Sequence, residues 1–151
     1  MKVLTVCLGN ICRSPAAQGI LQHVADQQGV ALELDSAGTA AYHIGKQPDK
    51  RSIKALNEVG LDITHQRARQ VAQDDFDQFD WILAMDSENL ANLKRLKPAN
   101  CRAKVVMFGR YRDGVNFGEV DDPYYGGDSG FASMREQLFE IAEDFVANLT
   151  K

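Results

Sequence analysis

Two residues near the N-terminus have side chains and a spacing that could do chemistry together. Cys7 and Arg13 stand six positions apart, as C-x5-R, in the stretch CLGNICRSP, which joins an apolar run to a helix-like run. An ionised thiol is a nucleophile, and a guanidinium is a planar fork that matches two oxygens of a phosphate-type anion. The stretch therefore predicts an anion site with a nucleophile at its base: the sulfur attacks, and the arginine holds what is attacked.

The loop between these residues has the composition of an anion-binding turn. Gly9 and Asn10 tolerate left-handed backbone conformations, which let successive N–H groups converge on one anion. Ser14 and Pro15 read as the N-cap and first residue of a helix, whose N-terminus favours negative charge. Such a cradle favours the thiolate of Cys7 over its thiol. We also expect Ser14 to donate a hydrogen bond to the sulfur.

Two adjacent carboxylates late in the chain are candidates for a general acid. Asp121 and Asp122 precede Pro123 in the segment 109–130, which is long for a loop and therefore favours a functional role. If Cys7 attacks a phosphate ester, the leaving alkoxide or phenoxide needs a proton. Proline restricts the residue before it to extended conformations, which fixes the direction of Asp122. We expect Asp122 to protonate the leaving group and later to activate the water that cleaves a cysteinyl-phosphate.

These residues need a scaffold that brings two distant loops together, and the apolar pattern indicates one. The expected strands are 2–7, 31–37, 81–85 and 104–108; the expected helices are 14–28, 53–59, 90–96 and 134–149. Their alternation predicts a three-layer α/β fold around a parallel sheet. Ligands of such folds bind at the carboxyl ends of the strands, where Cys7, Asp86 and the loop after Phe108 emerge.

Length and composition exclude several classes of protein. The 151 residues suit one compact domain, 1–151, and a net charge of −4 argues against nucleic-acid binding, which needs a basic surface. No apolar run approaches the length that crosses a bilayer, and the N-terminus lacks the features of a signal peptide. Three cysteines, Cys7, Cys12 and Cys101, are too few and unpaired for a disulfide scaffold, so we expect a reducing, cytoplasmic location.

Simpler interpretations of the same residues stay open. Alone, Cys7 would more often be a buried strand cysteine and Asp86 a helix N-cap. Cys101 is read as structural or incidental, and Cys12 as a residue that could simply pack before the helix. A metal site on Cys7 and Cys12 is disfavoured because the histidines form no second cluster; they are His23, His43 and His65. No common nucleotide-binding glycine loop is present. A non-catalytic phosphate- or phosphotyrosine-binding module would use the loop and Arg13 but need neither Cys7 nor Asp122.

The stretch CLGNICRSP, together with DPYYGG near the C-terminus, resembles the low-molecular-weight protein-tyrosine phosphatases. The likeness covers essentially the whole chain, including DSAG after the second expected strand and MD after the third. The resemblance implies a four-stranded parallel sheet flanked by helices and hydrolysis of protein phosphotyrosine and aryl phosphates through a cysteinyl-phosphate. In that reaction Cys7 is the nucleophile, Arg13 the phosphate clamp and Asp122 the general acid and base. It implies no metal or organic cofactor.

The resemblance also implies supporting roles. Asn10 would hold the shape of the loop, with Ser36 and His65 behind it, and Cys12 would form a reversible protective disulfide with Cys7. The residues implied to bind substrate are Leu8, Gly9, Asn10, Ile11, Cys12, Ser14, Tyr42 and Tyr124. The implied partners are a phosphotyrosine-containing protein, inorganic phosphate or oxyanion inhibitors, with neither nucleic acid nor membrane, and a homodimer through the active-site rim is allowed.

Two other activities occur in the same superfamily. Arsenate reductases relay a disulfide through two further cysteines in mid-chain, and this sequence has none between Cys12 and Cys101. Protein-arginine phosphatases carry threonine at the position of Ile11, where isoleucine narrows the pocket wall and favours a flat phenyl ring. Both stay as alternatives to the phosphotyrosine activity.

Overall fold

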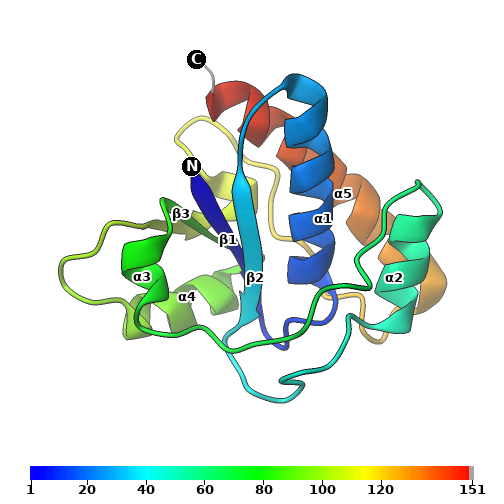
Figure 1. Cartoon of the computed structure of the whole chain (residues 1–151), viewed down its shortest axis with the longest axis horizontal. Helices are drawn as coiled ribbons and strands as arrows, with labels where there is room; N and C mark the ends of the chain where they lie inside the picture. Colours follow the sequence, from blue (N-terminus) through cyan, green and yellow to red (C-terminus); the bar gives the residue numbers. More distant parts are fainter. Residues whose placement is uncertain (150–151) are drawn as a thin grey trace.

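The computed structural model describes residues 1–149; the last two residues of the expected domain, 150 and 151, lie outside the described residues. A single parallel sheet has the strand order β2-β1-β3-β4. The strands are β1 Lys2–Cys7, β2 Glu33–Gly38, β3 Trp81–Ala84 and β4 Lys104–Met107. The predicted α/β architecture with four parallel strands is confirmed (Figure 1).

The register of the sheet brings the carboxyl ends of the strands to one edge. Cys7, the last residue of β1, pairs with Gly38, the last residue of β2, and Ala84 at the end of β3 lies between Val6 and Met107. The chain leaves β1 for β2 on one side and then crosses to β3 on the other side. Cys7 therefore stands at the point where the strand order reverses, which is where open α/β sheets bind ligands.

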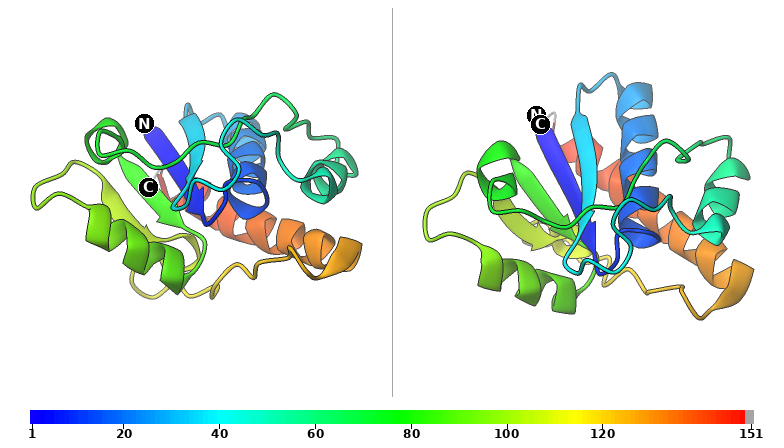
Figure 2. Two further views of the ribbon diagram at one scale, coloured as in Figure 1. Left: turned by 90° about the horizontal axis from the view of Figure 1, so that it is seen from below. Right: turned by 60° about the horizontal axis from the view of Figure 1, so that its bottom comes forward.

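Helices cover both faces of the sheet (Figures 1 and 2). On one face, α1 Arg13–Gln28 packs along α5 Gly127–Leu149, and α2 Lys50–Asn57 lies against both helices. On the other face lie α3 Asp75–Gln78 and α4 Ser87–Leu96. Each face has its own core, since alternate strand residues such as Val3 and Leu4 pack into different clusters. The edge of the sheet at which the carboxyl ends of the strands meet is thus packed against helices on both faces.

All four expected helices begin earlier than predicted, and a further α-helix is present. Helix α1 begins at Arg13 with Cys12 in the N-cap position and no side-chain cap, so Ser14 is not the cap; its hydroxyl is used elsewhere. Helix α2 spans Lys50–Asn57 instead of 53–59, because Asp49 caps it through the Arg51 N–H. Helix α4 likewise begins at Ser87 instead of 90, because Asp86 caps it. The short α3 was not predicted. Helix α5 begins at Gly127, which shortens the expected loop 109–130.

A short 3₁₀ turn, Phe108–Arg110, follows β4 and starts the segment that leads to α5. That segment passes the carboxyl ends of the strands before it joins α5 next to α2 (Figure 2). Within residues 1–149, none of the helices combines the length and apolar character that spanning a bilayer would need.

Candidate active site

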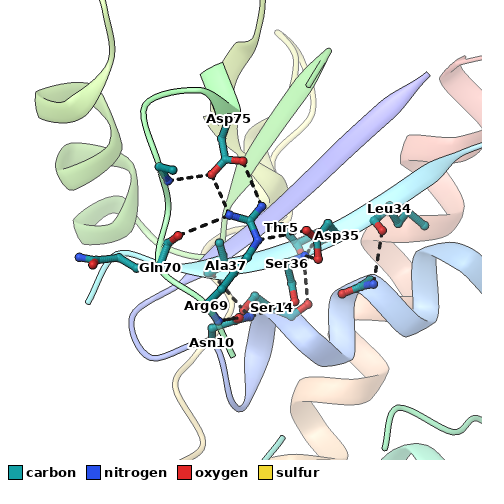
Figure 3. Close-up of polar contacts among 12 residues, drawn as sticks. Thr5, Asn10, Ser14, Leu34, Asp35, Ser36, Ala37, Arg69, Gln70 and Asp75 are labelled. Atoms are coloured by element: carbon teal, nitrogen blue, oxygen red, sulfur yellow. Dashed lines mark hydrogen bonds and ion pairs between the residues drawn. The ribbon is translucent and has the colours of Figure 1, made fainter. Parts of the chain in front are cut away.

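The loop after β1 is held in an unusual backbone conformation by the side chain of Asn10. Asn10 has a positive φ of 58° and is almost completely buried, a conformation that an L residue adopts at a cost unless its surroundings hold it. Its Nδ2 donates to Ser14 Oγ at 2.8 Å and to Ser36 Oγ at 2.9 Å, and its Oδ1 accepts from the Arg69 N–H at 2.9 Å. Three elements therefore fix this loop (Figure 3).

Arg69 is itself anchored by two carboxylates behind the loop. Its Nε donates to Asp35 Oδ2 at 3.1 Å, and its two terminal nitrogens donate to Asp75 at 2.9 and 3.1 Å. Partial burial opposes the charge of Arg69, but the bonds to Asp75 and Asp35 raise its pKa above the ordinary value. This ion network presses segment 67–70 onto the loop, so that the backbone N–H reaches Asn10 (Figure 3).

The sulfur of Cys7 lies beside the hydroxyl of Ser14, which already accepts a hydrogen bond from Asn10. Ser14 Oγ is 3.1 Å from Cys7 Sγ and is fully buried. Because this oxygen already accepts from Asn10 Nδ2, its own proton is free to point toward the sulfur or, more weakly, toward the Ala37 carbonyl at 3.4 Å. A hydrogen bond to the charged form stabilises a thiolate. The arrangement thus has a donor ready for ionised sulfur.

The guanidinium of Arg13 is fixed in position at the start of α1. Its Nη1 donates to Asp86 Oδ2 at 2.6 Å and to the Val120 carbonyl at 3.0 Å, while Nη2 lies 3.8 Å from Asp122 Oδ2. Burial opposes its charge, but Cys7 and Asp86 more than offset that effect and raise the pKa of Arg13. Arg13 therefore remains a cation with a fixed plane, as bidentate binding of an oxyanion requires.

Asp86 has a second role besides the N-cap that its position predicted. Its Oδ1 accepts from the Asn89 N–H at 2.7 Å, which caps α4, while Oδ2 holds Arg13. One carboxylate thus joins the helix after β3 to the guanidinium at the start of α1. The sequence placed Asp86 at the correct edge of the sheet without indicating its contact with Arg13.

These groups surround one hollow of about 340 Å³ at the carboxyl ends of the strands. The residues lining it are Cys7, Leu8, Gly9, Ile11, Cys12, Arg13, Tyr42, His43, Asp122, Tyr124 and Tyr125. At its base are the sulfur and the loop; at its side is a carboxylate; at its rim are aromatic rings. An oxyanion at the base would contact a nucleophile, a cation and loop N–H groups at once, with a proton donor nearby.

Comparison with known proteins shows which protein family this chain resembles. The model of the low molecular weight phosphotyrosine protein phosphatases matches residues 2–151. A curated protein of that description from Schizosaccharomyces pombe is 42% identical over 152 residues, covering 99% of this chain and 97% of its own. The chain belongs to the low-molecular-weight phosphotyrosine phosphatase family. Its membership covers both the loop with Cys7 and the late loop with Asp122.

Solved structures of similar proteins agree with the family and the fold. The protein tyrosine phosphatase of Entamoeba histolytica, with Hepes in its active site, superposes with a TM-score of 0.91 at 36% identity, covering 99% of this chain and 97% of the other. The Drosophila arginine phosphatase DARP superposes with a TM-score of 0.91 at 33% identity, covering 100% and 99%. The solved structures that this chain resembles therefore include one named for phosphatase activity on tyrosine and one named for activity on arginine.

Most of the residues that the sequence singled out meet in this hollow. Nine of them line it, and Asn10, Ser14 and Ser36 lie directly beneath it as one hydrogen-bonded group. His65 does not belong to that group, and its predicted support of Asn10 is wrong. Its side chain is exposed and faces a separate hollow with His23 and Asp26. The Arg69 N–H occupies the place behind Asn10 instead.

The packing of segment 61–70 explains the error at His65. Ile63, Gln66 and Ala68 are the residues of this segment that point inward, which leaves His65 outside. The buried Gln66 donates through Nε2 to the Pro15 carbonyl at 3.1 Å and so supports the start of α1. An irregular segment of this kind has no period from which the direction of one side chain could be predicted.

Two residues that line the hollow, His43 and Tyr125, were not predicted from the sequence. His43 lines the hollow next to Tyr42, and its ring lies so close to Gly9 that an added Cβ there would be 3.0 Å from His43 Cδ2. Tyr125 lines the outer rim and is 96% exposed. Their adjacency to the predicted Tyr42 and Tyr124 was the only signal, and it does not distinguish a rim residue from a loop residue.

The other two cysteines lie in different environments. Cys12 lines the hollow and is buried; burial, with Asp49 and Cys7 nearby, raises the pKa of its thiol above the ordinary value. It is therefore a neutral thiol at physiological pH and does not compete as a nucleophile. Cys101 is half-buried, and its sulfur donates to the Ala103 carbonyl at 3.6 Å.

Proposed function

We propose that this phosphatase hydrolyses protein phosphotyrosine, and aryl phosphates generally, through a cysteinyl-phosphate intermediate. The observation that carries the proposal is that Cys7, Arg13 and Asp122, which come from two distant loops, line one hollow. A binding module would need the loop and Arg13 alone. Here a hydroxyl stands 3.1 Å from the sulfur and the Asp122 carboxylate lines the same hollow, and a binding module would require neither.

In the first step the thiolate of Cys7 attacks phosphorus and the bond from phosphorus to the ester oxygen breaks. Asp122 gives its proton to that oxygen, which leaves as a neutral phenol. Negative charge on the three equatorial oxygens is stabilised by the loop N–H groups and by Arg13, whose position Asp86 fixes. The step needs an ionised sulfur and a protonated carboxyl together, so the rate should be greatest on the acid side of neutral pH.

In the second step a water molecule attacks the phosphorus of the cysteinyl-phosphate. Asp122, now ionised, takes a proton from that water, and the bond between sulfur and phosphorus breaks to release inorganic phosphate. The departing thiolate is stabilised by Ser14 Oγ, which lies 3.1 Å away in a fully buried position. Asp122 and Cys7 are then returned to their starting protonation states.

The walls of the hollow favour a flat aromatic substrate. Leu8 and Ile11, which belong to the loop itself, give the hollow apolar walls, and Tyr42 and Tyr124 stand at the rim as exposed residues. A phenyl ring between such surfaces gains apolar contact and ring stacking, whereas a short phosphoserine would leave the phosphate away from the loop. We therefore place phosphotyrosine ahead of phosphoserine and phosphoarginine.

Cellular context and assembly follow from the same proposal. The reaction requires Cys7 to be a free thiol, which a reducing compartment maintains, so we propose a cytoplasmic location. The protective disulfide between Cys7 and Cys12 remains a prediction, and the raised pKa of Cys12 implies that its proton must be removed for the bond to form. Self-association through the exposed rim tyrosines likewise remains a prediction.

The substrate class is tested by comparing three phosphopeptides of one sequence. We expect kcat/KM for the phosphotyrosine peptide to exceed the values for the phosphoserine and phosphoarginine peptides by at least about 100-fold, a difference of about 3 kcal/mol in transition-state binding. Phosphate release is the readout, and Cys7→Ser is the blank. A preference for phosphoarginine would instead assign this chain to the alternative activity.

A further inference from the structure

The first turn of α2 is bonded to the phosphate-binding loop. The Asp49 N–H donates to the Ile11 carbonyl at 2.7 Å, and Ser52 Oγ donates to the Cys12 carbonyl at 2.9 Å. Both carbonyls belong to the loop between Cys7 and Arg13. The start of α2 is therefore a rigid extension of that loop, and a side chain that leaves it has a defined position relative to the nucleophile.

The side chain of Arg51 extends from this turn toward residues 111–126, the segment before α5 that carries Asp122 and is called the acid loop below. Its Nη1 donates to the Tyr124 carbonyl at 2.7 Å, and its guanidinium carbon lies 5.2 Å from the centre of the Tyr124 ring. The same guanidinium lies 4.7 Å from the centre of the Phe131 ring in α5. The Tyr124 N–H in turn donates to Asp122 Oδ1 at 3.1 Å. One cation thus contacts both the backbone and the ring of the residue that holds the catalytic carboxylate.

Asp49 fixes the direction of this guanidinium. Its carboxylate accepts from Arg51 Nε and Nη2, both at 3.0 Å, in a two-pronged arrangement. Partial burial opposes ionisation of Asp49, but the hydrogen bonds from Arg51 hold its pKa below the ordinary value. The pair is therefore charged at neutral pH, and a planar fork held at both ends by one carboxylate has little rotational freedom left.

We propose that Arg51 is a positioning residue that sets the acid loop against the phosphate-binding loop. Arg51 is not among the residues that line the catalytic hollow, so it acts through Tyr124 and Asp122 and not on the substrate. The inference rests on the proposed role of Asp122 as the general acid. Loss of the clamp would leave the nucleophile and Arg13 intact while the carboxyl group loses its fixed place over the leaving oxygen.

The test compares substrates that need the proton with substrates that do not. For Arg51→Ala we expect kcat/KM for phenyl phosphate, which reports the phosphorylation step and not the later hydrolysis of the cysteinyl-phosphate, to fall by about 10- to 100-fold, as displacement of a catalytic group by about 1 Å does. For 2,4-dinitrophenyl phosphate, whose leaving group needs no proton, we expect kcat/KM to change by less than about threefold. Arg51→Lys keeps the positive charge beside Asp49 but loses the planar fork, so it should also slow phenyl phosphate more than 2,4-dinitrophenyl phosphate, by a smaller factor. If Arg51→Ala is unstable, Arg51→Lys is measured in its place.

The matched control is Lys54→Ala. Lys54 lies on the same helix and forms an exposed ion pair of 2.7 Å with Asp128 of α5, but it does not contact the acid loop. The substitution Lys54→Ala therefore removes one link between α2 and α5 without changing any contact of Tyr124. Both phosphates should be hydrolysed by Lys54→Ala within about twofold of the unmodified rate, and the Tm of each variant shows whether folding is retained.

Asp122→Asn, alone and combined with Arg51→Ala, separates failure of the inference from failure of the proposed function. If Asp122 is the acid, Asp122→Asn lowers kcat/KM selectively for phenyl phosphate; an equal loss of kcat/KM for both substrates would remove Asp122 from that role. If Arg51 acts through Asp122, adding Arg51→Ala to Asp122→Asn costs less than about twofold more on phenyl phosphate. A full additional loss of kcat/KM for phenyl phosphate in the double variant, or an equal loss of kcat/KM for both substrates in Arg51→Ala, would overturn the inference.

Discussion

Cys7→Ser should abolish turnover of p-nitrophenyl phosphate while leaving inorganic phosphate able to bind. We expect kcat to fall by at least about 10⁴-fold, on the order of the loss when a covalent nucleophile is removed from other hydrolases. A serine hydroxyl does not ionise near neutral pH, so the attacking group is lost. Phosphate affinity should persist because the loop held by Asn10 and the guanidinium of Arg13 remain.

Calorimetric titration with inorganic phosphate and a stopped assay with p-nitrophenyl phosphate measure the two effects on the same preparation. Cys101→Ser is the matched control, since its sulfur donates only to the nearby Ala103 carbonyl and lies outside the hollow. It should behave as the unmodified protein. Turnover at a normal rate by Cys7→Ser would show that another group attacks phosphorus.

Arg13→Lys should be nearly as damaging, although it conserves the charge. We expect kcat/KM to fall by about 10²- to 10⁴-fold, because two charge-assisted hydrogen bonds contribute about 1.5–3 kcal/mol each. The guanidinium bonds to Asp86 and the Val120 carbonyl through one nitrogen and keeps its other nitrogens for an oxyanion. A lysine ammonium is a point charge, so it cannot hold Asp86 and two phosphate oxygens in one plane.

Steady-state kinetics on p-nitrophenyl phosphate, with phosphate as a competitive inhibitor, separates the losses in kcat and in anion affinity. Arg110→Lys is the control, because the exposed Arg110 bonds to Asn116 and neither residue lines the hollow. A loss of less than about tenfold for Arg13→Lys would mean that charge alone is needed there and that the two-pronged geometry is not.

The sequence predicted the elements that are set locally. A buried strand, a turn with Gly9 and Asn10, and a helix predicted from Ser14 and observed from Arg13 follow from neighbouring residues, and in a parallel sheet the strand ends must share one edge. That is why Cys7, Arg13 and the loop of Asp122 could be placed together from residue types alone. Asp86 was placed at that edge for the same reason, although only as a cap.

The supporting contacts could not be predicted because they join residues far apart in the chain. Arg69 pairs with Asp35 across 34 positions, and Arg51 reaches Tyr124 across 73. No local pattern marks which carboxylate or carbonyl a surface arginine will meet. His65 was misplaced because the segment around it is irregular, and the correct partner of Asn10 is a backbone N–H, which no residue type reveals.

The site therefore has two levels of organisation. The reacting groups lie on the strand-to-helix turn and on the acid loop, and two arginines outside the hollow hold these parts. Arg69 fixes the loop from behind through Asn10, and Arg51 fixes the acid loop from the side through Tyr124. Both arginines are themselves held by carboxylates, Asp75 and Asp49. Such supporting contacts maintain the geometry that a catalytic site needs.

The most direct measurement of the mechanism is to trap the phosphorylated enzyme. Asp122→Ala should still be phosphorylated by p-nitrophenyl phosphate, whose leaving group is good, but it should lose the phosphate slowly because no base activates water. Acid quenching followed by mass spectrometry of the proteolytic peptides should then show one phosphate on the peptide that contains Cys7, and none in Cys7→Ser. Phosphate on a different residue, or turnover with no phosphorylated cysteine at any quench time, would contradict the account.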